Sequence, residues 1–271
     1  MAGMAPELVG MTGWFGRWRR ARAVRRQAID ARQWQQVVSR FSFLRMLPAA
    51  DQRRLYELVA VFLDRKAISG AGGQDMTREM QLVIAAQACL LVLNLDLDFY
   101  DDWVEIIVYP DEFVIDHEYM DEDGVMHHVR APASGEAWEQ GPVILSWRDA
   151  EEADGGDGYN VVLHEFAHKI DIRNGTADGF PPLHADMDRQ AWTDTLSAAF
   201  EDFQQRLERR EETALDEYAA EDPAEFFAVL SELFFERPDA LAKMYPAVYG
   251  QFTQFYRQDP LLRMRPASNR A

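Results

Sequence analysis

The chain of 271 residues has 28 lysines and arginines against 46 aspartates and glutamates, a formal net charge of −18 at pH 7. Hydrophobic residues make up 48% of it, which provides a sizeable core and excludes a disordered chain. A single cysteine, Cys89, excludes a disulfide framework and argues against a cysteine-based zinc site. No segment reaches the ~18 to 20 apolar residues of a membrane span, and residues 1–16 do not resemble a signal peptide. We therefore expect a cytoplasmic protein.

The charge is unevenly distributed along the chain. Residues 1–66 carry 13 basic and 5 acidic side chains, and the remainder carries 15 basic and 41 acidic ones. An acidic body repels phosphates, so nucleic acid is not the expected partner. The arginine-rich segment 17–32, with Trp14 and Trp18 among its neighbours, predicts a basic helix. We favour docking of this helix on the acidic body, with contact to a membrane or a partner as the alternative.

The first half of the chain reads as helices followed by strands. Helical periodicity covers residues 29–66, and Pro48 begins a new helix over residues 49–64. A glycine-rich loop at 70–73 precedes a buried helix over 77–93. The pattern predicts strands at residues 104–109, 113–115, 125–129 and 143–147.

The second half reads as helices. A polar loop at residues 151–158 leads into a helix that begins near Asn160. Further helices are expected at residues 185–210, 223–237 and 239–258, with a tail from Pro260. This order predicts an α+β fold that is mostly helical, with a small mixed sheet and an N-terminal helical region. We expect a basic arm or helix over 1–39, a catalytic domain over 40–260 and a tail over 261–271.

The segment His164-Glu165-Phe166-Ala167-His168 contains candidate residues for metal binding and for proton transfer. Histidines four residues apart lie on one helix face and can share one metal ion. Two neutral imidazoles can hold Zn²⁺ and leave room for a water molecule, whose pKa the metal lowers towards ~7. Glu165 is placed one step around the helix, where it takes the proton of that water and returns it to the leaving amine. The pattern therefore predicts a zinc hydrolase with one Zn²⁺ per chain.

The third zinc ligand must come from another segment. The metzincin extension requires glycine and histidine three and six residues after His168, and Asp171 and Asn174 exclude it. A later helix that opens with Asp222-Pro223 supplies two candidates, Glu225 and Glu232, on one face. Glu225 is surrounded by apolar residues, where an unpaired carboxylate is costly, so we favour it as the ligand. Glu232 is expected to lie behind the ligands or at the surface.

Three blocks of sequence resemble the MtfA (Mlc titration factor A) family of bacterial zinc metallopeptidases. The first is GEAW at residues 135–138 with GPVILSW at 141–147. The second is NVVLHEFAH at 160–168 with ADG at 177–179, and the third is AEFFAVLSE at 224–232. The resemblance spans roughly residues 40–260, and the joint pattern is far more specific than the zinc motif alone.

The resemblance implies a gluzincin whose catalytic core is related to the protease domain of anthrax lethal factor. It implies aminopeptidase activity on small peptides or amino-acid amides, and binding of the glucose-regulon repressor Mlc. Carried onto this sequence, it implies the ligands His164, His168 and Glu225, with Glu165 as general base. It also implies that Tyr218 stabilises the developing oxyanion and that an upstream histidine occupies the open zinc position in a resting form.

His127 is the best match for that upstream histidine, although the neighbouring His128 leaves the assignment between the two open. His117 and His184 are expected to be surface residues. The leading interpretation is thus a cytoplasmic zinc-dependent peptidase. The alternative is a regulatory protein that sequesters a transcription factor and in which the zinc site is secondary. Glu165 favours the peptidase, because a structural metal site has no use for a base beside its ligands.

Overall fold

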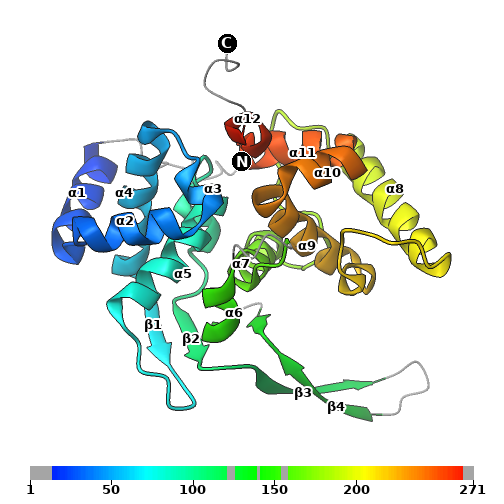
Figure 1. Cartoon of the computed structure of the whole chain (residues 1–271), viewed down its shortest axis with the longest axis horizontal. Coiled ribbons are helices and arrows are strands. Elements are labelled where there is room, and N and C mark those ends of the chain that lie inside the picture. The colour runs from blue at the N-terminus through cyan, green and yellow to red at the C-terminus, as the bar shows by residue number, and fades with distance from the viewer. Residues whose placement is uncertain (1–13, 121–125, 139–140, 154–157, 265–271) are drawn as a thin grey trace, which may run out of the picture.

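The computed structural model describes residues 14–120, 126–138, 141–153 and 158–264, without the side chains of residues 14–15 and 115–132. As expected, the fold is α+β and mostly helical, with a small mixed sheet. The N-terminal helices lie on one side and the C-terminal helices on the other (Figure 1). The helix that carries the two predicted zinc histidines, α7 (Val161–Asp171), lies between the two groups.

The sheet has four strands in the order β1, β2, β6, β5. Three of them, β1 (Ala67–Gly70), β2 (Glu105–Tyr109) and β6 (Val143–Ser146), run parallel. The short strand β5 (Gly135–Ala137) pairs antiparallel with β6 and lies at the end of the sheet. A separate antiparallel hairpin extends away from the sheet along the lower edge of Figure 1; it is formed by β3 (Phe113–Met120) and β4 (Met126–Ala133).

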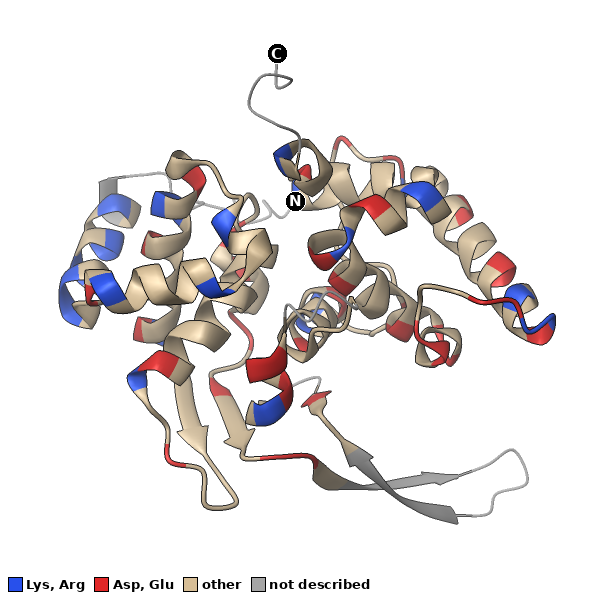
Figure 2. Ribbon diagram, viewed as in Figure 1, with Lys and Arg blue, Asp and Glu red and all other residues tan. Residues whose placement is uncertain are grey.

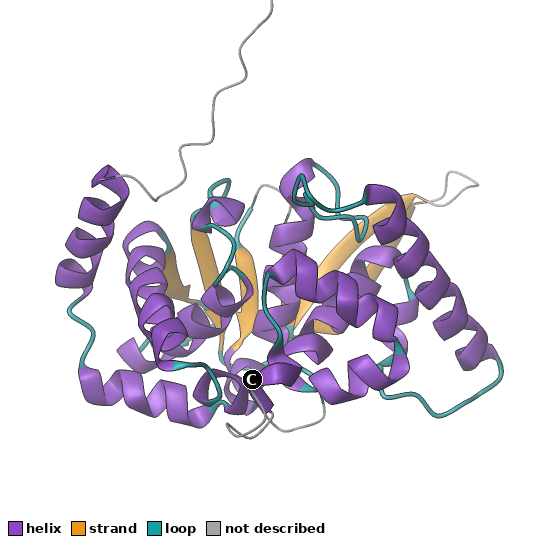
Figure 3. Cartoon of the chain, turned by 90° about the horizontal axis from the view of Figure 1, so that it is seen from above, coloured by secondary structure: helices purple, strands orange, loops and turns teal. Residues whose placement is uncertain are grey.

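Helices cover the sheet and enclose the core (Figure 3). The N-terminal group comprises α1 (Trp14–Gln27), α2 (Ala31–Arg40), α3 (Ser42–Arg45), α4 (Ala49–Arg65) and α5 (Arg78–Leu91). The apolar run predicted as a buried helix forms α5, in which Cys89 is buried. The C-terminal group comprises α8 (Arg189–Glu208), α9 (Pro223–Glu236), α10 (Pro238–Met244), α11 (Pro246–Tyr256) and α12 (Pro260–Met264).

The arginine-rich segment forms α1, which packs against α4. Its arginines stand out in Figure 2 at the far end of the N-terminal group. An ion pair of 2.9 Å joins the Arg26 guanidinium to the Asp64 carboxylate of α4. Within the described ranges, no helix combines the length and apolar character needed to cross a membrane. The division into arm, domain and tail stays a prediction.

Several local predictions were wrong. Three short elements were not expected: β1, β5 and the helix α6 (Trp147–Glu152). Each has too few residues to show the regular spacing of apolar side chains that identifies a strand or a helix. Pro246 splits the helix expected over 239–258 into α10 and α11, since proline at a first helical position cannot continue the preceding helix. The expected tail begins with the short helix α12.

Candidate metal centre

Helix α7 is held in place by its cap and by its buried side chains. The Asn160 side chain accepts a hydrogen bond of 3.0 Å from the Leu163 amide and so begins the helix. Every residue from Val161 to Asp171 is buried. Phe166, between the two histidines, contacts an aromatic cluster with ring centroids 5.3 to 5.8 Å away, formed by Phe62, Tyr100 and Trp103. The helix is thus fixed on the face opposite the histidines.

Helix α9 delivers the carboxylate of Glu225. The Asp222 carboxylate caps this helix by accepting hydrogen bonds from the amides of Ala224 (2.7 Å) and Glu225 (3.0 Å). Pro223 occupies the first turn, where its missing amide hydrogen costs nothing. Glu225 therefore lies in the first turn of a rigid helix and faces α7.

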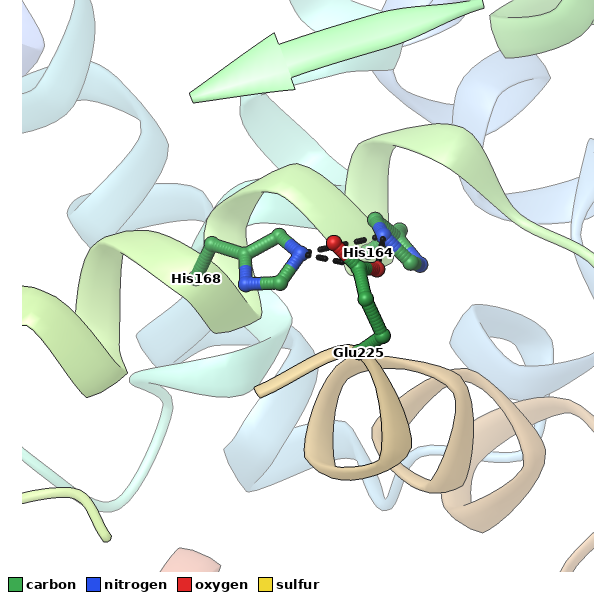
Figure 4. A group of neighbouring side chains, drawn as sticks. All are labelled: His164, His168 and Glu225. Atoms are coloured by element: carbon green, nitrogen blue, oxygen red, sulfur yellow. Dashed lines mark hydrogen bonds and ion pairs between the residues drawn. The ribbon is translucent and has the colours of Figure 1, made fainter. Parts of the chain in front are cut away.

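The three predicted ligands converge, and their side chains point toward one another from α7 and α9 (Figure 4). Glu225 Oε2 lies 3.0 Å from His164 Nε2 and 3.3 Å from His168 Nε2. The two Nε2 atoms are 3.1 Å apart. One ligand atom from each residue lies within 4.8 Å of the others, and within the described ranges this is the cluster that can hold a metal ion.

Glu232 supports the site from behind His164. Its Oε1 lies 2.7 Å from His164 Nδ1, and the side chain is 1% exposed. A proton on Nδ1 that is donated to this carboxylate leaves the Nε2 lone pair free for a metal. Glu232 Oε2 accepts the Asn160 amide hydrogen, and the Asn160 side chain donates to Gln87 Oε1 and Glu236 Oε1, both at 2.8 Å. Glu232 thus lies behind the predicted ligands, where it orients the His164 ring, and is not at the surface.

The protonation of this cluster follows from its hydrogen bonds. Burial opposes charge on His164, but hydrogen bonds to Glu225 and Glu232 outweigh it and raise the pKa of the imidazole. Burial also opposes charge on Glu225, yet hydrogen bonds from the two histidines lower its pKa. The centre therefore combines an ionised carboxylate with two imidazoles, a donor set that suits Zn²⁺ once the metal-facing nitrogens carry no proton.

Glu165 lies beside the cluster and against β5. Burial raises the pKa of its carboxyl group to about 7, with the charges of His164 and His168 opposing that rise. A Cβ atom at position 135 would lie 2.7 Å from Cδ of Glu165, so any larger residue there would displace the Glu165 side chain. A carboxyl group with a pKa near neutrality suits a group that accepts and returns a proton.

A cavity of about 690 Å³ opens on one side of the centre. His164 and Glu165 contribute to its wall, together with Gly135 of β5. Tyr218, on the short helix η3 (Glu217–Ala220), also lines it, with its ring centroid 6.1 Å from that of His164. Burial and the Glu225 carboxylate raise the pKa of the Tyr218 phenol, which keeps its hydroxyl group protonated and able to donate.

The loop after α7 ties α7 to α9. Asp171 Oδ2 accepts the Gly179 amide hydrogen at 2.7 Å. Gly179 has φ of +73°, and a Cβ there would lie 2.5 Å from the Pro223 carbonyl oxygen. The ADG block at 177–179 therefore requires glycine for its backbone conformation and for its approach to α9. The sequence alone did not reveal this role.

The remaining histidines fall into two groups. His127 belongs to β4, where it pairs with Tyr119 of β3, but its side chain and those of His117 and His128 are outside the described part of the structure. His184 is half-buried, and its Nε2 lies 2.8 Å from the Phe255 carbonyl oxygen. It is therefore partly exposed and anchored to α11 by one ring nitrogen.

The family of the chain follows from comparison with known proteins. A sequence profile described as glucose-regulated metallo-peptidase M90 matches residues 15–257. The chain belongs to this M90 metallopeptidase family. Mlc titration factor A of Klebsiella pneumoniae (strain 342) is 40% identical over 86% of this chain and 88% of that protein. Proteins of the same name from Serratia proteamaculans (strain 568) and Escherichia fergusonii are 40% and 38% identical, over 88% and 93% of this chain and 92% and 96% of their own lengths.

Membership of the M90 family implies a metal ion, and the side chains present fit one. Two imidazole nitrogens and one carboxylate oxygen form a three-ligand set, which leaves a fourth position for water or substrate. The carboxylate of Glu232 behind His164 matches the way in which metal-binding histidines are commonly oriented by a hydrogen-bonded carboxylate. In the sequence, their spacing indicated the two histidines and its apolar surroundings favoured Glu225. The role of Gly135 was not predicted, because it depends on contact between distant segments.

Proposed function

We propose that this M90 family member is a zinc-dependent aminopeptidase in which His164, His168 and Glu225 hold the metal ion. The observation that carries the proposal is the convergence of these three side chains next to a cavity whose wall includes His164 and Glu165. A bound Zn²⁺ would polarise the scissile carbonyl group and lower the pKa of water towards ~7. Proton transfer and stabilisation of the developing negative charge would be carried out by side chains of this chain.

Glu165 is the group that moves the proton in this proposal. Its carboxylate takes a proton from the attacking water at Oε1 or Oε2 and passes it to the amine that leaves when the C–N bond breaks. A pKa of about 7 allows both steps near neutral pH. Tyr218 donates its hydroxyl hydrogen to the oxygen on which negative charge develops.

The charge of the cavity favours substrates with a free amino terminus. Asp149, Glu165, Asp216 and Glu232 line it, and no lysine or arginine does so among the described residues. A protonated α-amino group is attracted by this wall, and a free carboxylate is repelled. The cavity therefore supports an aminopeptidase over a carboxypeptidase, with small peptides or amino-acid amides as substrates.

A regulatory role is proposed from the names of the relatives, which are Mlc titration factors. We propose that this chain also binds a transcriptional repressor of the Mlc type in the cytoplasm. His127 is retained as a candidate inhibitory ligand of the zinc ion. Calorimetric titration of the repressor into the zinc-loaded protein tests the first point, and absence of binding at micromolar concentrations would contradict it.

The test of the peptidase proposal is turnover of chromogenic amino-acid amides by the zinc-loaded wild type and by Glu165→Gln. The variant should keep its zinc and lose activity by roughly 10² to 10⁴, as expected when an acid–base group is removed. Acetylation of the substrate amino group should abolish turnover by the wild type. Equal activity of the two proteins would refute the role of Glu165, and turnover of the acetylated substrate would refute the exopeptidase assignment.

A further inference from the structure

Two buried lysines flank one aromatic ring in the core. Lys169 follows His168 on α7 and is 3% exposed, and Lys66, directly after α4, is 8% exposed. Their ammonium nitrogens lie 5.4 Å and 3.8 Å from the centroid of the Trp103 ring. Fully buried lysines are rare and require partners, so the partners of each ammonium group indicate its role.

Lys169 binds the connection between two strands. Its ammonium group donates to the carbonyl oxygens of Trp138 and of Gly141, the latter at 3.0 Å. Both acceptors lie between the end of β5 and the beginning of β6. Charge-assisted hydrogen bonds of this kind are about twice as strong as neutral ones. The helix with the metal-binding histidines is thereby tied to the end of the sheet.

Strand β5 runs along α7 and is held there at two points one helical turn apart. Gly135 lies against Glu165 at one end of the strand, and Trp138 binds Lys169 at the other. Among the described strands β5 pairs only with β6, so one side of it has no strand neighbour. Ala133, Ser134 and Gly135 also form part of the cavity wall. The position of that wall depends on the contacts with α7.

We propose that Lys169 is a positioning residue, whose ammonium group holds β5 at the distance from α7 that the substrate cavity requires. This inference rests on the proposed peptidase function, and Lys169 itself does not touch the substrate. Loss of the ammonium group removes the charged donor from both carbonyl groups and leaves the Trp138 oxygen with only the hydrogen bond of 3.3 Å from the Gly141 amide, so the strand can move. The wall then binds substrate less well, while the metal ligands keep their places on α7 and α9.

Lys66 provides a matched control. It is a buried lysine that contacts the same ring, and it also donates to two carbonyl oxygens, those of Tyr100 and Trp103. Neither acceptor adjoins β5 or lines the cavity, whereas the Lys169 acceptor Trp138 directly follows β5. Lys66→Met therefore removes an equivalent set of contacts and reports the general cost of losing a buried lysine at this place.

The experiment compares Lys169→Met with Lys66→Met in the zinc-loaded protein. Deuterium uptake at residues 134–138 should rise in Lys169→Met and stay at the wild-type level in Lys66→Met. For amide substrates, Lys169→Met should raise KM by about tenfold and keep kcat within about twofold, with zinc retained. If Lys169→Met does not fold, Lys169→Gln, which keeps a donor and loses the charge, is expected to change both quantities in the same direction.

Equal uptake at residues 134–138 and equal KM in the two methionine variants would overturn the proposal, because Lys169 would then serve stability alone. If the wild type turned over no amide, the peptidase function would fail. The difference in deuterium uptake between the two variants would still decide whether Lys169 holds β5.

Discussion

The carboxylate behind His164 offers a sharp test of how the site is organised. Glu232 Oε1 lies 2.7 Å from His164 Nδ1 and is buried, so no water can replace it readily. Loss of such a carboxylate typically weakens metal binding by about 10- to 100-fold, or about 1.4 to 2.7 kcal/mol. Glu232→Gln keeps the shape and an acceptor oxygen but loses the charge, so we expect about a tenfold weaker affinity for zinc.

The assay is competition for zinc between the protein and a chelating dye, with Glu236→Gln as the control. Glu236 lies on the same helix and accepts from the same Asn160 side chain, but the carboxylate at His164 Nδ1 is that of Glu232. The control should bind zinc as the wild type does. Wild-type affinity in Glu232→Gln, or an equal loss in both variants, would refute the view that Glu232 orients the histidine.

Three further predictions concern the cavity wall, the oxyanion and the buried lysine. Gly135→Ala should keep zinc and lower kcat, because the new Cβ displaces the Glu165 carboxyl group; an unchanged kcat would refute this contact. Tyr218→Phe should keep zinc and lower kcat by about 10² to 10³, with KM little changed, and amide turnover measures both. Burial lowers the pKa of Lys66 to about 8 from 10.5, so the unfolded chain binds this proton more tightly and stability rises with pH between those values. Denaturant unfolding should show the wild type gaining about 2 to 3 kcal/mol relative to Lys66→Met between about pH 7 and 10.

The sequence was sufficient to predict those parts of the site that depend on residues close together in the chain. A pair of histidines four residues apart requires only one helix to bring them together, and Asn160 caps that helix. The first-turn position of Glu225 after Asp222-Pro223 is equally a local pattern. These patterns were sufficient to name the side chains that converge in the structure.

The wall of the cavity could not be predicted, because it depends on contacts between distant segments. Gly135 and Glu165 are 30 positions apart in the sequence, and nothing in the local pattern of β5 shows that a side chain would collide there. Lys169 reads as a polar residue near the end of a helix, and only the fold shows that its ammonium group is buried beside Trp138. Short strands such as β5 also lack enough residues to reveal their period.

In the proposed site, Glu225 joins His164 and His168 as a ligand of one zinc ion. Direct calorimetric titration of zinc into chelator-treated wild type and Glu225→Gln tests this assignment. The wild type should bind one zinc ion per chain, and loss of one of three protein ligands should weaken binding by at least about 100-fold. Equal affinity and stoichiometry in the two proteins would contradict the claim and require a different third ligand.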